Sequence, residues 1–348
     1  MSRAASLSLV FLGACSSARQ LPAAEAPEAF EASTPAPLCM PTGKSQKSDF
    51  CIPTLELGRW LREAKVKIVG LEPTEDGEGG ASRAAVELTE KKREVSLELK
   101  VKPVPPEGAA FNNDPRKQVA AYALDRLLFD DGEIVVPPTA VRCIPLSALP
   151  APKNSDAEPI DGFHESSCAL LLLQLWMDGV EQFERPKDGA PGATLAALGR
   201  LNIFVHLIGH RDSNPFNFLQ SKSEPRHFLS VDNEIAFSGL LFNPLPKLTG
   251  DDWSQIKVDA VSKSLHEALA RLTDARLASL LVVTELERRG DRWVNVPPRA
   301  PIDVTRGAVI EANRVQLGLT EDEVKGIAAR RDEVLLRIDK GELRLVGR

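Results

Sequence analysis

The stretch from Leu201 to Gly239 constrains the fold more than any other part of the sequence. It begins with an apolar run of helical spacing, breaks at Gly209, and continues as the polar loop His210 to Asn217. Two short apolar pieces follow, separated by a charged gap, and the second ends in Asp232-Asn233-Glu234. This pattern predicts a helix, a polar loop and two paired strands that place the loop beside an acid.

The polar loop carries the residue types that phosphoryl transfer needs. Asn217 lies five positions after Asp212, and Asp232 lies twenty positions after it. In this chemistry one Asp accepts the proton of the attacking hydroxyl, while the Asn and a second Asp hold the metal that bridges the nucleotide phosphates. HRDxxPxN followed by a strand-borne Asp resembles the catalytic loop and metal acid of protein kinases. A polar loop that only connects core elements is the alternative.

Composition limits the classes of protein that need to be weighed. The chain has 348 residues, of which 43% are hydrophobic, which suggests two domains or one large two-lobed domain with a real core. A net charge of -6 argues against a nucleic-acid partner. No run of about 18 apolar residues occurs, so no membrane-spanning helix is expected.

The N-terminus predicts export. Residues 1–15 combine a short positive start, a compact apolar run and small residues before Cys15. This resembles a bacterial lipoprotein signal peptide, after which Cys15 carries lipid and anchors the protein to a membrane surface of the cell envelope, on the periplasmic or cell-surface face. A plain secretory signal or a wrongly assigned start is the alternative. Residues 16–50 predict a disordered tether.

Four cysteines remain once Cys15 is assigned to the anchor. An even number in an exported chain suggests disulfides. Cys39 with Cys51 and Cys143 with Cys168 are the local pairs, although four cysteines allow three pairings. Their spacings fit no zinc site.

Residues 51–178 predict a nucleotide-binding small lobe. Strands are expected over 66–71, 84–88 and 95–101, and the loop between the first two contains Gly77, Gly79 and Gly80. Glycines let backbone N–H groups approach phosphates, although an ordinary hairpin turn would have the same composition. Lys100 and Lys102 share one face of the third strand, so either can reach a ligand there.

A helix follows that strand and a buried strand leads out of the small lobe. Asn112 to Pro115 predicts the helix start, and Gln118 is expected to face Lys102. A carboxamide can hydrogen-bond a lysine but cannot neutralise it. Residues 169–176 are nearly all apolar, as in a central strand.

Six short motifs occur in the order found in one kinase family. They are Lys102-Pro103, AAYALDRLL, VPPTAVR, LLLQLWMDGV, LIGHRDSNPFNFL and LSVDNEIAFSG, and the resemblance that rests on them covers roughly residues 66 to 240. Together they resemble the atypical secretory-pathway kinases of the Golgi casein kinase and four-jointed type. The Asp-Asn-x-x-Ala-Phe ending is also similar to that of type II phosphatidylinositol 4-kinases.

The resemblance implies a two-lobed α+β protein-kinase-like fold. A small antiparallel β lobe with one helix would precede a larger, mainly helical lobe at residues 179–348. The resemblance further implies that Lys102 binds the phosphates, that Asp212 is the base, and that Asn217 and Asp232 hold Mg or Mn. Gln118 stands where active members of the family usually have Glu, and one pseudokinase branch carries Gln there.

The remaining residues, 240–348, predict supporting helices. These are expected over 253–272, 275–289, 302–317 and 320–338, and the last begins with a capping box at Thr320 and Glu323.

Two functional hypotheses remain. The first is a metal-dependent kinase that transfers the terminal phosphoryl group of ATP to a hydroxyl on a protein, or less favourably on a lipid or glycan. Its predicted cofactor-binding residues are Lys102, Gln118, Gly77, Gly79 and Gly80. The second is a lipid-anchored pseudokinase that senses nucleotide or scaffolds partners.

Overall fold

The structure is a computed structural model that describes the greater part of the chain from Cys39 onward. The described residues are 39–40, 50–51, 53–74, 80–91, 93–110, 113–150, 160–187, 189–210, 217–222, 225–237 and 252–347. The signal peptide with Cys15, most of the tether, Gly77, Gly79 and Asp212 lie outside them, so the roles assigned to those residues stay predictions.

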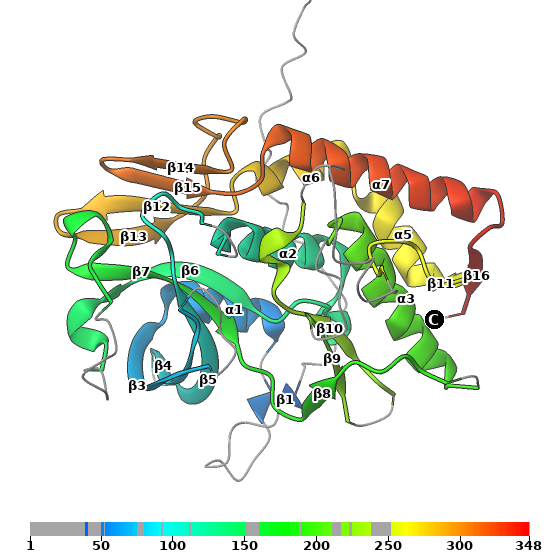
Figure 1. Cartoon of the computed structure of the whole chain (residues 1–348), viewed down its shortest axis with the longest axis horizontal. Helices are drawn as coiled ribbons and strands as arrows, with labels where there is room; N and C mark the ends of the chain where they lie inside the picture. The colour runs from blue at the N-terminus through cyan, green and yellow to red at the C-terminus, as the bar shows by residue number, and fades with distance from the viewer. Residues whose placement is uncertain are drawn as a thin grey trace, which may run out of the picture.

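A five-stranded antiparallel sheet forms the small lobe, shown in blue to green in Figure 1. Its spatial order is β3-β4-β5-β7-β6, where the strands are β3 (Lys65–Pro73), β4 (Ser82–Glu90), β5 (Arg93–Pro103), β6 (Thr139–Pro145) and β7 (Cys168–Leu175). β7 is buried at every position, as its continuous apolar sequence predicts for a strand covered on both faces.

Alternation along β5 gives the sheet two different faces. Val95, Leu97, Leu99 and Val101 are buried, and between them lie polar residues that include Lys100. The apolar face packs under α1 (Thr54–Glu63), in which Leu57, Trp60 and Leu61 are fully buried. Lys100 and Lys102 therefore project from the opposite face, towards the rest of the molecule.

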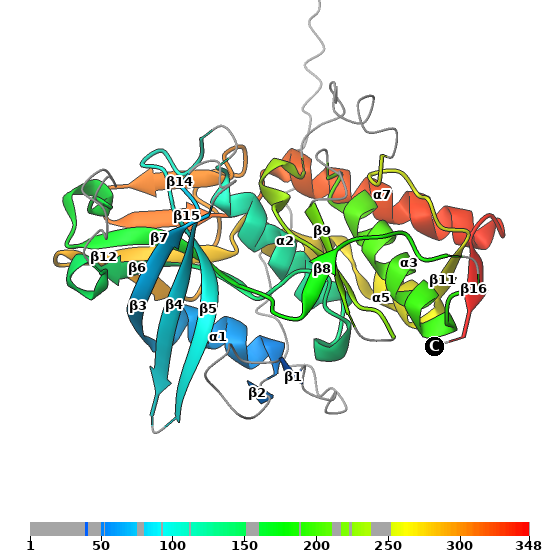
Figure 2. The ribbon, with the colours of Figure 1, turned by 60° about the horizontal axis from the view of Figure 1, so that its bottom comes forward.

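Helix α2 (Pro115–Leu128) lies between the two lobes (Figure 2). Pro115 occupies its first turn, where the missing N–H costs no intrahelical bond. Ala120, Ala121 and Leu124 are buried in the core of the large lobe, whereas Val119 belongs to a core shared with the small-lobe sheet. The helix is thus fixed from both sides.

The large lobe is built around α3 (Gly192–Leu207), which is buried from Leu201 to Leu207. Around it lie β8 (Val180–Gln182), β9 (Phe218–Ser221), β10 (Phe228–Ser230), β11 (Ala260–Ser262), α5 (Lys263–Arg271), α6 (Asp274–Ala278), α7 (Glu321–Asp339) and β16 (Arg344–Val346). The capping box predicted at the start of α7 is confirmed. In the part of the chain that the structure describes, no helix is long and apolar enough to cross a membrane.

Residues 284–317 form a four-stranded sheet, which corrects the prediction of helices over 275–289 and 302–317. Its order is β13-β12-β15-β14, with β12 (Thr284–Arg289), β13 (Arg292–Val296), β14 (Ala308–Glu311) and β15 (Arg314–Leu317). The expected helix over 253–272 likewise shrinks to α5, which follows the short strand β11.

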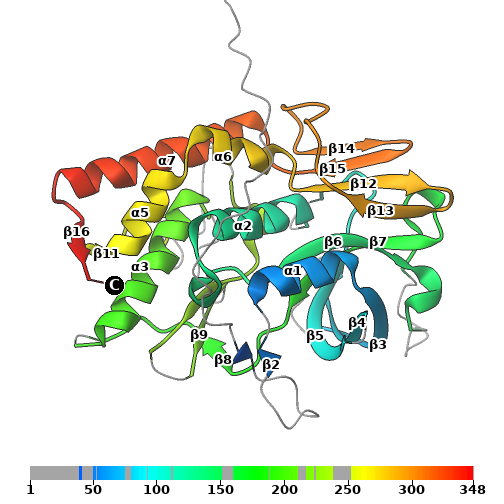
Figure 3. The ribbon, with the colours of Figure 1, turned by 180° about the vertical axis from the view of Figure 1, so that it is seen from behind.

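Tertiary packing explains why this region is a sheet. Gly290, with φ of 66°, turns the chain between β12 and β13, where the left-handed region favours glycine. Leu286, Val315 and Leu317 pack into one core with β6 and β7. The sheet of residues 284–317 therefore packs against the small-lobe sheet, as Figure 3 shows from behind.

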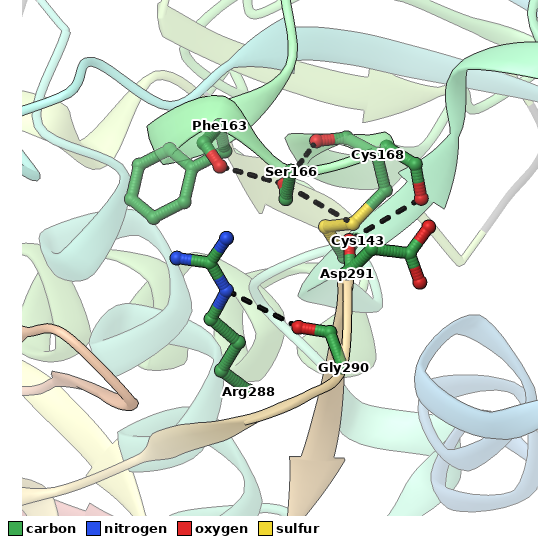
Figure 4. The surroundings of a disulfide bond; sticks show 8 residues. Cys143, Phe163, Ser166, Cys168, Arg288, Gly290 and Asp291 are labelled. Carbon is green, nitrogen blue, oxygen red and sulfur yellow. Dashed lines mark hydrogen bonds between the residues drawn. A yellow bond between two sulfur atoms is a disulfide. The ribbon is translucent and has the colours of Figure 1, made fainter.

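A disulfide ties the small-lobe sheet together. Cys143 on β6 is bonded to Cys168 on β7, which confirms one of the two local pairs predicted from the sequence. Ser166 Oγ lies beside it and donates to Phe163 O at 2.6 Å (Figure 4). For the other pair, the backbone of Cys39 stands opposite that of Cys51 in the antiparallel ladder of β1 (Cys39–Met40) and β2 (Phe50–Cys51).

Candidate functional site

The candidate site is centred on the turn that follows β10, which we call the acid turn (residues 231–235). Strands β9 and β10 pair antiparallel and deliver the chain to Asp232, which adopts the left-handed conformation with φ of 54° and ψ of 47°. Asp tolerates this region better than most residues. The short 3-10 helix η5 (Asn233–Ile235) then places Glu234 on the same turn.

Helix α2 fixes the acid turn directly through Gln118. Gln118 Oε1 accepts a hydrogen bond from Asn233 N at 2.7 Å, and both residues are buried. Ser230 Oγ donates to Asn233 Oδ1, also at 2.7 Å. Because a buried N–H needs a partner, the side chain of Gln118 sets where Asn233 sits.

Near its C-terminal end, α2 also supports β10, through Asp125. Asp125 Oδ1 accepts from Val135 N at 2.6 Å and from Val136 N at 3.1 Å. Val135 O in turn accepts from Ser230 N at 2.7 Å. Gln118 and Asp125 are seven residues apart, or two helical turns, so one face of α2 supports both. Burial raises the pKa of Asp125 to about 7.

Two lysines of β5 meet the acid turn. Lys100 Nζ is ion-paired with Asp232, and Lys102 Nζ donates to Glu234 Oε2 at 2.6 Å. The first pair is partly open, with 47% of the Asp232 side chain exposed, whereas the Lys102 and Glu234 side chains are 4% and 8% exposed. Two ion pairs therefore connect the small-lobe sheet to the acid turn of the large lobe.

The two acids respond differently to this environment. Burial acts to raise the pKa of Asp232, but the charge and hydrogen bond of Lys100 outweigh it and hold the pKa below its usual value. At Glu234 burial dominates, and Lys102 offsets only part of it, so the pKa is raised. Asp232 is the more readily ionised of the two carboxyl groups.

The end of the predicted catalytic loop lies against the acid turn. Asn217 is 8% exposed, and its carbonyl accepts a hydrogen bond from Val231 N at 2.9 Å, one residue before Asp232. His210, at the other end of the loop, is buried with its ring centroid 6.0 Å from that of Phe218. Asp212 falls in the part of the loop that is not described.

The glycine-rich loop is described only at its ends. Thr74 N donates to Ala81 O at 3.2 Å, which closes the β3–β4 hairpin. Gly80 has φ of 76°, a conformation that side chains other than glycine rarely adopt. Gly77 and Gly79 lie outside the described residues.

The acid turn and the adjacent Asn217 carry oxygen donors that suit a hard divalent cation. Carboxylate and amide oxygens, as in Asp232 and Asn217, are the ligands that Mg²⁺ and Mn²⁺ prefer. Within the described residues, no group of three His, Cys, Asp or Glu side chains could hold a metal ion. Gln118 Nε2 is buried there without a hydrogen-bond partner, because only the Oε1 of this side chain is used, in its bond to Asn233 N.

The structure thus brings together Lys102, Gln118, Asn217 and Asp232, which the sequence had singled out. It corrects one contact, because Gln118 bonds to the backbone of Asn233 and not to Lys102. Sequence reasoning missed Glu234 and the contact of Lys100 with Asp232. The alternation of β5 pointed to Lys100, but no local signal marked Glu234 as a lysine partner.

Comparison with known proteins gives a distant structural similarity. No family model and no curated protein matches the sequence. A crystal structure of the Golgi casein kinase is similar over 82% of this chain and 76% of that chain, with a TM-score of 0.46 and 14% identity. Its crystal structure with Mn/ADP bound is similar over 83% and 76%, with a TM-score of 0.47 and 14% identity.

The chain has a two-lobed α+β fold, and its own elements define it. These are the five-stranded sheet, helix α2 between the lobes, and the helical lobe that carries β9, β10 and the acid turn. At 14% identity the similarity carries no residue role from one protein to the other. The likeness of the acid turn to type II phosphatidylinositol 4-kinases stays a prediction from the sequence.

Proposed function

We propose that the chain is a metal-dependent phosphotransferase that moves the terminal phosphoryl group of a nucleoside triphosphate to a hydroxyl on a protein. The observation that carries the proposal is the meeting of Lys100 and Lys102 with Asp232 and Glu234 where the two lobes join. Fixed cations opposite fixed carboxylates suit a polyphosphate that arrives together with a divalent ion.

Each part of the site has a role in this chemistry. Mg or Mn, when bound, neutralises phosphate charge, and the oxygens of Asp232 and Asn217 would hold it. Lys102 and Lys100 supply positive charge to phosphate oxygens. Asp212 would orient the acceptor hydroxyl and accept its proton.

The proposal extends to where the protein works. Cys15 would carry the lipid that holds the chain on a membrane surface of the bacterial envelope, with residues 16–50 as the tether. The Cys143–Cys168 disulfide supports an exported location, because such bonds persist in oxidising compartments.

Nucleotide binding is tested first, by thermal unfolding with ATP and MnCl₂ or MgCl₂. A ligand that binds only the native state stabilises it, by about 2.7 kcal/mol at a concentration one hundred times its Kd. We expect a higher melting temperature with ATP and metal together, and no rise for Asp232→Asn. An unchanged melting temperature for the native sequence under all conditions would refute the proposal.

Transfer is tested with radiolabelled ATP and panels of protein, lipid and glycan acceptors. We expect label on a protein acceptor, and none with Asp212→Ala. A nucleotide-binding protein without transfer is the second candidate, because α2 presents Gln118 and no acid towards the site. Stabilisation by ATP without labelling of any acceptor would favour this second candidate.

A further inference from the structure

We infer that Glu234 is the positioning residue for Lys102, a role that an acid of α2 would otherwise fill. α2 contains a single acid, Asp125, which binds the backbone of Val135 and Val136. Gln118 bonds to Asn233, so no side chain of α2 supplies a negative charge to the lysine. Glu234 supplies it from the acid turn.

Burial makes this contact different from the other ion pairs of the small-lobe sheet. Lys102 Nζ and Glu234 Oε2 are 2.6 Å apart, and their side chains are 4% and 8% exposed. Lys67 and Glu87 pair at 2.8 Å on the same sheet, but their side chains are 66% and 30% exposed. Water solvates the second pair, whereas removing one partner of the first leaves a charge buried without its counterion.

The two acids of the turn pair with the two lysines of β5 in the same order along the chain. Lys100 and Lys102 are two residues apart on one face of β5, and Asp232 and Glu234 are two residues apart on the turn. Glu234 pairs with Lys102, the more buried lysine, and Asp232 therefore lies in the more exposed position beside Lys100. Lys102 is thereby held at a fixed place relative to the proposed metal ligand.

This arrangement has a consequence for regulation. In protein kinases the lysine is paired with an acid of the neighbouring helix, so the position of that helix controls the pair. Here the acid belongs to the same turn as Asp232, and α2 holds that turn through Gln118. The lysine and the metal acid are therefore tied to one turn, and α2 acts on both through the bond from Asn233 N to Gln118.

The pairing is tested in the free protein, with no assumption about the proposed function. Thermal unfolding compares Lys102→Met, Glu234→Gln and the double variant with the matched control set Lys67→Met, Glu87→Gln and its double. We expect each single change at the buried pair to lower the melting temperature by roughly 5 °C or more, and the double variant to melt above both. The control variants stay within about 2 °C of the native sequence.

The positioning role rests on the proposed function and is tested by nucleotide affinity. Calorimetric titration with ATP and MnCl₂ should give a Kd about tenfold higher for Glu234→Gln, which corresponds to about 1.4 kcal/mol. Glu234→Asp keeps the charge and should stay within about threefold of the native Kd, and Glu87→Gln should match it. If transfer is measurable, kcat should fall by a larger factor in Glu234→Gln than KM rises.

Two results would overturn the inference. One is additive melting shifts for Lys102→Met and Glu234→Gln. The other is native nucleotide affinity in Glu234→Gln while Lys102→Met has lost it. If the native protein binds no nucleotide, the proposed function fails, whereas non-additive melting would still establish the pair.

Discussion

In the part of the chain that the structure describes, two glutamates are buried, and their surroundings shift their pKa values in opposite directions. Glu285 on β12 accepts from Arg299 Nε at 2.6 Å, Arg314 Nε at 2.8 Å and Gln316 Nε2 at 2.9 Å. We call these four residues the Glu285 clamp. Glu234 on the acid turn forms its ion pair with Lys102.

Their ionisation differs accordingly. At Glu285, burial opposes ionisation, but hydrogen bonds from Arg314, Gln316 and Arg299 outweigh it and lower the pKa to about 2. At Glu234, burial wins and the pKa is raised. The Glu285 clamp satisfies its carboxylate fully and closes the loop between β13 and β14, which is a structural task. The acid turn leaves its carboxyl groups less fully satisfied, as expected of groups that meet a ligand.

The largest effect is expected from Asp232→Asn. The change keeps the shape and the tolerance for a positive φ, but removes the charge that would hold the metal. Phosphoryl transfer should fall by about a thousandfold or more, measured as initial rate with radiolabelled ATP. The melting temperature should change little, because Asp232 is half exposed. Phosphoryl transfer at the native rate in this variant would show that the acid turn takes no part in catalysis.

Glu285→Gln should lower stability and leave nucleotide binding unchanged, which is the reverse of the result expected for Asp232→Asn. It removes the buried counterion of Arg314 and of Arg299, which keeps Glu287 at 2.7 Å, so the free energy of unfolding should fall by about 2 kcal/mol in urea titrations. Nucleotide Kd, measured on the folded fraction, should equal that of the native sequence. A change in Kd without loss of stability would assign the Glu285 clamp to the site and remove the contrast.

The pH dependence of the free energy of unfolding tests the lowered pKa of Glu285, which distinguishes it from Glu234. Because the folded pKa of Glu285 is about 2 and the unfolded value is about 4.3, ionised Glu285 stabilises the fold above about pH 4.5. That contribution, roughly 3 kcal/mol, is lost as pH falls towards 2. Urea titrations from pH 5 to pH 2.5 should show a steeper loss for the native sequence than for Glu285→Gln. Parallel curves would contradict the depressed pKa.

The smallest effect is expected from Gln118→Leu. Asn233 N loses its acceptor in a buried place, which costs about 1 to 2 kcal/mol of unfolding free energy. The acid turn should also be held less firmly, and nucleotide Kd should rise a few-fold by calorimetry. Equal Kd values for the Leu variant and the native sequence would show that α2 does not position the turn.

Much of the fold is readable from the sequence where neighbours along the chain decide it. The apolar alternation of β5, the proline at the start of α2 and the capping box of α7 are local signals, and each element forms as predicted. The Cys143–Cys168 bond was one of two local pairs, and it forms between adjacent strands.

The sequence predicted helices where residues 284–317 form a sheet, and this error has a physical reason. Leu, Glu and Arg around Leu286 favour a helix locally, but packing of Leu286 and Val315 against β6 and β7 selects strands. A partner 154 residues away leaves no mark on local propensity, as with Asn295 Nδ2, which donates to Val141 O at 2.9 Å.

For the candidate site, the sequence by itself determined which residue types are present: two lysines on one strand face, a carboxamide in a helix, and two acids two residues apart. Only the tertiary structure decided the pairing of Lys100 with Asp232 and Lys102 with Glu234, and the turn of Gln118 towards Asn233. Each lysine meets an acid 132 positions further along the chain. Charge attraction depends on distance in space and on exclusion of water, and neither is set until the two lobes have packed.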